Sequence, residues 1–105
     1  YYFRLKLKLK GFQRHFLRSK AHYLKPKVQI GKNNINEGVI NAIKEAFNSN
    51  ELIKIKLYSS QDKEEQISKI TSQIECFIVG DIGKVLIAFK EFPEKEYRKI
   101  KLPNK

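Results

Sequence analysis

Apolar and basic residues alternate with a period of two at the start of the chain. Residues 3–10 place an apolar side chain at every odd position and a Lys or Arg at every even position. This period is typical of a strand with one apolar and one polar face. We therefore expect 1–10 to form a basic N-terminal strand or arm, followed by a single domain over 11–103.

Three later segments have the spacing of amphipathic helices. The first is expected over 12–24 and should end before Lys25-Pro26, because the residue before a proline is pushed toward extended geometry. The second should begin after Asn36, a residue type that caps helix N-termini, and end at 48–50. The third is expected from about Asp62 to Gln73, with carboxylates in its first turn, where the helix dipole favours them.

Four short apolar runs, over 27–30, 52–58, 76–79 and 84–89, indicate strands. In the second run Lys54 and Lys56 alternate with isoleucines, which predicts a half-buried strand with a basic outer face. The segment 80–83 spells Gly-x-x-Gly, but it joins two strands and is expected to be a hairpin turn or bulge. The order of elements indicates an α/β fold in one small domain, α-β-α-β-α-β-β.

The positive charge of the chain is concentrated in its first third. Residues 1–32 contain ten Lys or Arg and no Asp or Glu, whereas the other 73 residues contain twelve cations and eleven acids, for a net charge of +11. Such a concentration creates a local potential that attracts polyanions. Nucleic acid, an anionic membrane surface and acidic proteins all remain open on charge alone, and the period of two argues against a membrane-binding amphipathic helix.

Residues suited to catalysis or metal binding are sparse. Cys76 is the only cysteine, which excludes a disulfide within the chain and a four-thiolate zinc site, and it is expected in the core. His15 and His22 are too far apart on a helix to share a metal. We expect no enzyme activity, no cofactor and no metal. Tyr23 and Tyr58 could stack on bases, but packing in the core or at its rim is the expected use of each.

Three stretches of the sequence together resemble one family. They are Gln13-Arg14-His15-Phe16-Leu17-Arg18 with Ala21-His22, then Val28-Gln29-Ile30-Gly31-Lys32-Asn33 running to Glu37-Gly38-Val39, and Glu51-Leu52-Ile53-Lys54-Ile55-Lys56. The later stretch Ile82-Gly83-Lys84-Val85-Leu86-Ile87 agrees with the closing hairpin of the same family. The chain resembles the CRM domain (chloroplast RNA splicing and ribosome maturation), in its stand-alone YhbY-type form, from about Phe12 to Leu102.

This resemblance implies an RNA-binding domain with a mixed four-stranded sheet, similar in fold to the C-terminal domain of translation initiation factor three. The RNA-contacting Gly-x-x-Gly loop of the family falls on Gly31, Lys32, Asn33 and Asn34, so that Asn34 replaces the last glycine. Asn tolerates a left-handed backbone, which would keep the turn, but its side chain would crowd a phosphate.

We expect one basic track along the domain to neutralise successive phosphates. The track begins with Arg14, Arg18 and His22, which lie at i, i+4 and i+8 on one face of the first expected helix. The loop at 31–34 and the start of the next helix would add backbone amides, since uncapped helix N-termini attract anions. The complete set of expected RNA-binding residues is Arg14, Arg18, His22, Lys25, Lys27, Gly31, Lys32, Asn33, Asn34, Lys54, Lys56 and Lys84.

Structured RNA is the expected partner, bound by shape and not by sequence. The resemblance favours precursor large-subunit ribosomal RNA within a pre-ribosomal particle, with the chain acting as a monomer in the cytoplasm of a bacterium. The alternatives are a domain of an organellar group II intron splicing factor, in a plastid or mitochondrion, or a basic protein-interaction module.

Overall fold

A computed structural model describes residues 9–31 and 35–100, so the strand expected at the N-terminus lies almost wholly outside the described residues. The elements follow the expected order: α1 (Gly11–Ala21), β1 (Pro26–Gln29), α2 (Glu37–Ser49), β2 (Leu52–Lys56), α3 (Lys63–Gln73), β3 (Phe77–Ile82), β4 (Val85–Phe89) and a short 3₁₀ helix, Lys95–Tyr97.

The four strands form one mixed sheet in the order β1-β2-β4-β3. β1 runs parallel to β2, and α2 makes the connection between them, as a parallel pair requires. β4 is antiparallel to both of its neighbours, β2 and β3. The predicted α/β class and the mixed four-stranded sheet are therefore confirmed.

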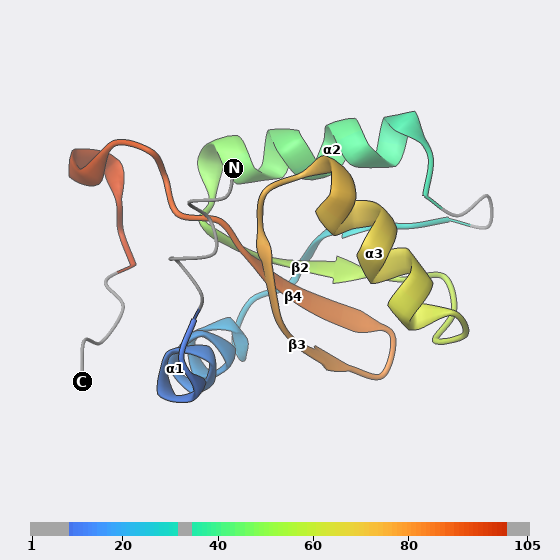
Figure 1. The fold of residues 1–105 in the computed structure, drawn as a ribbon, viewed down its shortest axis with the longest axis horizontal. Coiled ribbons are helices and arrows are strands. Elements are labelled where there is room, and N and C mark those ends of the chain that lie inside the picture. Colours follow the sequence, from blue (N-terminus) through green and yellow to red (C-terminus); the bar gives the residue numbers. More distant parts are fainter. Residues whose placement is uncertain (1–8, 32–34, 101–105) are drawn as a thin grey trace.

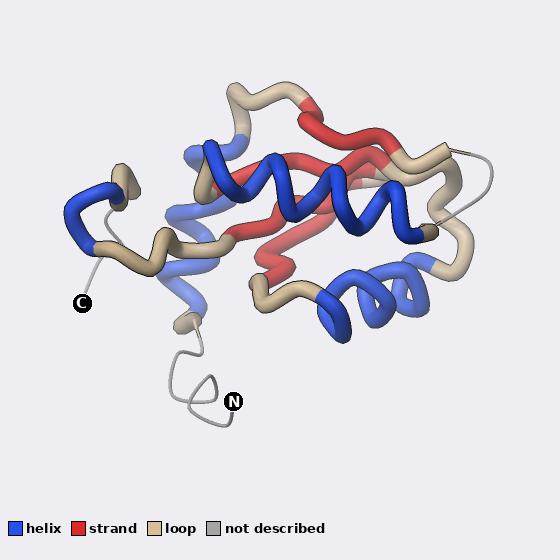
Figure 2. Tube along the Cα trace, turned by 90° about the horizontal axis from the view of Figure 1, so that it is seen from above, coloured by secondary structure: helices blue, strands red, loops and turns tan. Residues whose placement is uncertain are grey.

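Helices cover the two faces of the sheet unequally. Figure 1 shows α2 and α3 above the sheet and α1 beneath one end of it, and Figure 2 shows α2 lying across the strands. The larger core lies under α2 and α3, where Ile43 and Ile70 pack on Ile53 and Ile55 of β2. The smaller core lies under α1, around Leu17. Among the described residues, α1 covers only one end of its face of the sheet (Figure 1).

Element boundaries differ from the predicted ones mainly at turns. The first helix ends at Ala21, earlier than expected, and leaves Tyr23 and Leu24 outside it. Asn36 caps α2 as predicted, its Oδ1 accepting a hydrogen bond of 2.9 Å from the Val39 amide. The strands of the hairpin extend to Ile82, so its turn is only the Gly83-Lys84 pair, with Gly83 at φ 58°. The predicted hairpin is confirmed, but its turn is shorter than the 80–83 that we expected, because residues 80–82 belong to β3.

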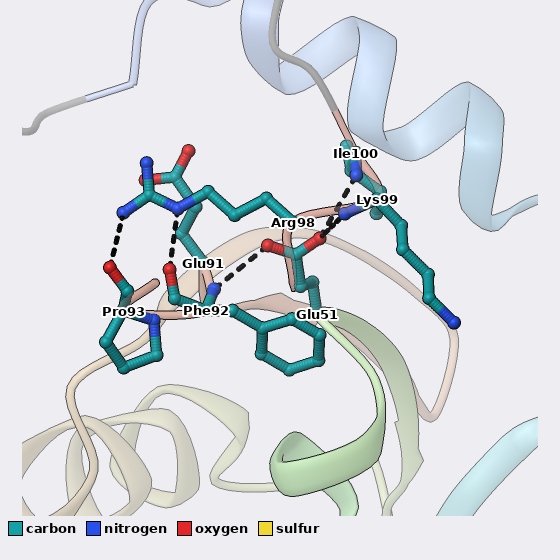
Figure 3. Close-up of polar contacts among 7 residues, drawn as sticks. All are labelled: Glu51, Glu91, Phe92, Pro93, Arg98, Lys99 and Ile100. Carbon is teal, nitrogen blue, oxygen red and sulfur yellow. Dashed lines mark hydrogen bonds and ion pairs between the residues drawn. The ribbon is translucent and has the colours of Figure 1, made fainter. Parts of the chain in front are cut away.

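A buried carboxylate holds the segment after β4 against the start of β2. Glu51 is 4% exposed, and its Oε2 accepts a hydrogen bond of 2.9 Å from the Phe92 amide. Its Oε1 accepts from the amides of Lys99 (2.8 Å) and Ile100 (3.1 Å), as Figure 3 shows. Three amides therefore satisfy this charge inside the protein.

Arg98 closes the same segment on itself. Its Nε and one terminal nitrogen donate to the carbonyls of Phe92 (2.6 Å) and Pro93 (3.3 Å), and its other terminal nitrogen lies 3.6 Å from Glu91 (Figure 3). Ile100 then packs on the smaller core, as the sequence predicted. Leu102, for which we predicted the same, lies outside the described residues.

Candidate nucleic-acid interface

The two lysines of β2 point away from α2 and α3. Ile53 and Ile55 are fully buried under those helices, and the alternation of a strand places Lys54 and Lys56 on the opposite face. Lys54 is half-buried and lies in register with Ile87 of β4, whereas Lys56 is exposed. The predicted basic outer face of this strand is confirmed.

The edge strand β1 adds a third lysine to this face. Val28 is buried in the larger core, whereas its neighbours Lys27 and Gln29 are exposed, with Lys27 at a bulge where the register with β2 shifts. Gln29 is in register with Lys56 of β2. The uncovered surface formed by Lys27, Lys54 and Lys56 is called the basic sheet face below.

Two more expected RNA-binding residues lie at the end of this surface. The Ile30 amide donates to the Lys56 carbonyl (2.8 Å), and the Leu57 amide donates to the Lys84 carbonyl (2.6 Å). The start of the Gly31 loop and the hairpin turn at Lys84 therefore flank the end of β2. A Cβ at Gly31 would meet no atom within 4 Å, so the backbone there is open to a ligand. Lys32, Asn33 and Asn34 lie outside the described residues.

Arg18 has a structural contact that the sequence did not predict. Its guanidinium donates to the Val79 carbonyl of β3 (3.0 Å), and its aliphatic stem crosses Gly80, where a Cβ would lie 2.5 Å from the Arg18 Cδ. Arg18 is exposed, as its place in the stripe predicts, but one of its guanidinium nitrogens also docks α1 onto the sheet. Arg14 and His22, one helical turn before and after it, are exposed.

The last turn of α1 and its connection to β1 carry further exposed cations. Lys25 precedes the proline that opens β1 and is exposed. Lys20 is also exposed, and its ammonium lies 5.4 Å from the centre of the Phe16 ring. The described cations thus include Lys27, Lys54 and Lys56 on two adjacent strands, with Lys84 and Gly31 near the end of β2 and α1 beneath one end of the sheet (Figure 1).

The start of α2 does not offer the anion site expected there. The Asn36 side chain already accepts the hydrogen bond that the Val39 amide could donate to an anion, and Glu37 adds a carboxylate to the first turn. Both features disfavour a phosphate at the helix N-terminus. Any backbone contact to RNA in this region is left to the loop that begins at Gly31.

Acidic residues lie mainly on other surfaces. They occur on α2 and α3, at the hairpin and in the segment after β4. Two of them form ion pairs, Lys63–Asp81 (2.6 Å) and Arg98–Glu91 (3.6 Å), and both cations lie outside the basic first third of the chain. Glu51, just before β2, is buried, and its carboxylate oxygens accept hydrogen bonds from backbone amides. The described elements α1, β1, β2 and β4 contain no acidic residue.

The described residues offer little for catalysis. They contain no cluster of three His, Cys, Asp or Glu side chains that could hold a metal ion. Cys76 packs against the larger core as predicted, and burial raises the pKa of its thiol from 9.0 to about 11, opposed by the charge of Lys90. A thiol with this pKa is protonated at neutral pH and a poor nucleophile. None of the described helices is both long and apolar enough to cross a membrane.

Comparison with known proteins identifies relatives of similar length. The model of the CRS1 / YhbY (CRM) domain matches residues 9–90. "Probable RNA-binding protein YqeI" of Bacillus subtilis is 37% identical over 97 residues, which cover 90% of this chain and 99% of the relative. An "RNA-binding protein" of Haemophilus influenzae is 37% identical over 95 residues, covering 89% of this chain and 93% of the relative.

A solved structure has the same architecture. The solution structure of the hypothetical protein SAV1595 from Staphylococcus aureus superposes with a TM-score of 0.78 at 34% identity, covering 91% of this chain and all of that one. The residues 9–90 that match the family model contain both strands of the basic sheet face.

Proposed function

The chain belongs to the CRS1 / YhbY (CRM) domain family, and from this we propose that it is a non-enzymatic protein that binds structured RNA through the basic sheet face and the exposed cations of α1. Two relatives whose names describe RNA-binding proteins match nearly their whole length. The similarity to these relatives supports RNA as the partner of this chain. The distribution of its lysines indicates which surface would bind the RNA.

The observation that carries the proposal is the uncovered sheet face. Lys54 and Lys56 are separated by the two-residue repeat of a strand, about 7 Å, and Lys27 is exposed on the adjacent strand at a bulge. Successive phosphates of a nucleic-acid strand are separated by similar distances. A rigid sheet therefore offers cations to a backbone with little loss of main-chain entropy.

Such contacts position an RNA without reading its bases. We propose that the chain prefers folded RNA to an unstructured strand, and that the natural ligand is precursor large-subunit ribosomal RNA in an assembling particle. An RNA of this kind presents closely spaced phosphates that a flat basic surface can follow. The role in a group II intron splicing factor is the second candidate, since the same surface would serve a folded intron.

The proposal is tested with the full chain and a folded ribosomal RNA fragment. We expect the logarithm of the affinity to fall with the logarithm of salt concentration with a slope of about −3, as expected for a few neutralised phosphates. The double substitution Lys27→Glu with Lys56→Glu should weaken binding about 100-fold at ~0.1 M salt and flatten that slope.

The matched control reverses two charges on the other side of the sheet, Lys44→Glu in α2 and Lys69→Glu in α3. Both lysines are exposed, so the net charge changes by the same amount as in the test variant. The control should keep most of the RNA affinity. Equal losses in the two variants, or tighter binding of the protein to anionic vesicles than to RNA, would contradict the proposal.

A further inference from the structure

A tyrosine ring lies open to solvent where α1 joins β1. Tyr23 is 88% exposed, the highest value among the exposed large hydrophobic residues of the described part of the chain. The expectation that it packs in the core or at its rim is therefore wrong. An aromatic ring left this exposed contributes little to folding, which makes a binding role the better use of it.

The backbone around this ring is well defined. The amides of His22 and Leu24 donate to the carbonyls of Ser19 (3.2 Å) and Ala21 (2.9 Å), which closes the turn after α1. The His22 ring meets the Tyr23 ring edge-on, with centroids 5.0 Å apart and an interplanar angle of 88°. Since a positioned ring loses little entropy on binding, this arrangement favours stacking.

Cations border the space beside the ring. Tyr23 lines a hollow of about 310 Å³ together with Leu24, Lys25, Pro26 and Lys27. A nucleotide has a flat base that stacks on aromatic rings and a phosphate that pairs with lysine. Lys27 belongs both to this hollow and to the basic sheet face, so the two surfaces are continuous.

We propose that Tyr23 and this hollow receive one unpaired base of an RNA whose backbone lies on the basic sheet face. The inference rests on the proposed function and narrows its ligand, since a fully paired helix has no base free to enter. The RNA preferred by this chain therefore carries a bulged or looped nucleotide beside a paired segment. Stacking accepts any base, so the site adds a preference for RNA shape without a preference for sequence.

A second exposed tyrosine shows what distinguishes this site. Tyr58 is 53% exposed and lines a hollow of about 290 Å³. Among the described residues, that hollow is bordered by the carboxylates of Asp62 and Glu65 and by a single cation, Lys69. Carboxylates repel a phosphate, so a base at Tyr58 would bring its own backbone into an unfavourable field. Tyr58→Ala is therefore the matched control.

The experiment uses the full chain and two RNA hairpins with the same stem. One carries a single bulged 2-aminopurine, whose fluorescence falls when the base stacks, and the other is fully paired. We expect the wild-type protein to bind the bulged hairpin about tenfold more tightly and to quench its fluorescence. Tyr23→Ala should lose both the preference and the quenching and keep its affinity for the paired hairpin, whereas Tyr23→Phe and Tyr58→Ala should retain all three.

The outcomes separate the two proposals. If the wild type binds both hairpins and Tyr23→Ala leaves the preference and quenching intact, the base site is wrong and the basic sheet face stands. The base site is also wrong if the wild type binds the two hairpins equally, or if Tyr23→Ala weakens both to the same extent. If the wild type binds neither RNA, the proposed function fails and this inference fails with it.

Discussion

The two faces of the sheet are built from the same strands but differ in cover and charge. Under α2 and α3 the strand residues are apolar and buried, and the outer surfaces of those helices carry Glu45, Glu64 and Glu65 among their charges. Under α1 the cover is partial, and the uncovered strand positions include Lys54 and Lys56. One face therefore carries the larger core, whereas the other carries the smaller core under α1 and presents lysines beside it.

The alternation within β2 makes this division possible. Each isoleucine of the strand faces the larger core, and each lysine faces the other side, so one five-residue segment serves stability and charge together. A shift of one residue in register would bury both lysines and expose the isoleucines. The division is thus protected by the large cost of burying unpaired ammonium groups.

The largest effect that we predict concerns Glu51, the buried acid at the start of β2. Glu51→Ala leaves the amides of Phe92, Lys99 and Ile100 without their acceptor, which should lower the free energy of unfolding by about 3 kcal/mol in urea titrations. RNA affinity of the folded variant, measured without denaturant, should be unchanged because the segment that Glu51 holds lies outside the basic sheet face.

Glu45→Ala is the control for this substitution, because Glu45 is an exposed acid of α2. Its removal should change the free energy of unfolding by less than about 0.5 kcal/mol. If Glu51→Ala proved equally mild, the three hydrogen bonds would not stabilise the domain. A large gain in RNA affinity would show instead that the carboxylate does offset the neighbouring lysines.

A smaller effect should appear at high pH on the apolar side of the sheet. The folded protein keeps the proton of Cys76 up to about pH 11, whereas an exposed thiol begins to lose it near pH 9. The stability contributed by the buried neutral thiol is therefore complete below pH 9 and is lost as the pH rises toward 11. We expect a loss of about 2 kcal/mol by pH 10.5.

Lysine and tyrosine residues also titrate in this range, so the measurement compares wild type with Cys76→Ala in urea titrations at pH 8.5 and pH 10.5. The variant should lose about 2 kcal/mol less stability than the wild type over this interval. Parallel losses in the two proteins would show that the thiol is accessible to water and that the core is looser there than its burial indicates.

The fold could be predicted from local patterns, whereas the contacts that complete the site could not. Periodicity in β2 predicts which side chains point outward, and Asn36 predicts the start of α2, because each depends on a few neighbouring residues. The hydrogen bonds of Glu51 join residues more than 40 positions apart in the sequence, and no local pattern predicts such a pairing. The exposure of Tyr23 follows from a helix that stops at Ala21 although the apolar spacing continues past it.

Arg18 shows the same limit within the site. Its position in a basic stripe predicts a solvent-facing cation, and only the close approach of α1 to β3 shows that the side chain crosses Gly80. A glycine in an apolar strand can mark such an approach, but it does not identify the element that approaches. Arg18 is still exposed, so it docks the helix with one guanidinium nitrogen while part of its side chain stays open to solvent.

The smallest predicted effect tests this docking directly. Gly80→Ala places a Cβ where the Arg18 stem lies, and because an arginine side chain can move, the cost should be mainly the lost hydrogen bond to the Val79 carbonyl, about 1 kcal/mol. Arg18→Ala removes the same bond and should cost about as much. The double variant should therefore lose about 1 kcal/mol and not the sum, because both changes break one contact.

Arg14→Ala supplies the control. Its small effect on the free energy of unfolding should add to that of Gly80→Ala in urea titrations, and it should weaken RNA binding with little effect on stability. If the costs of Gly80→Ala and Arg18→Ala simply add, Arg18 does not dock on β3 in solution and all of the stripe is free to contact phosphate.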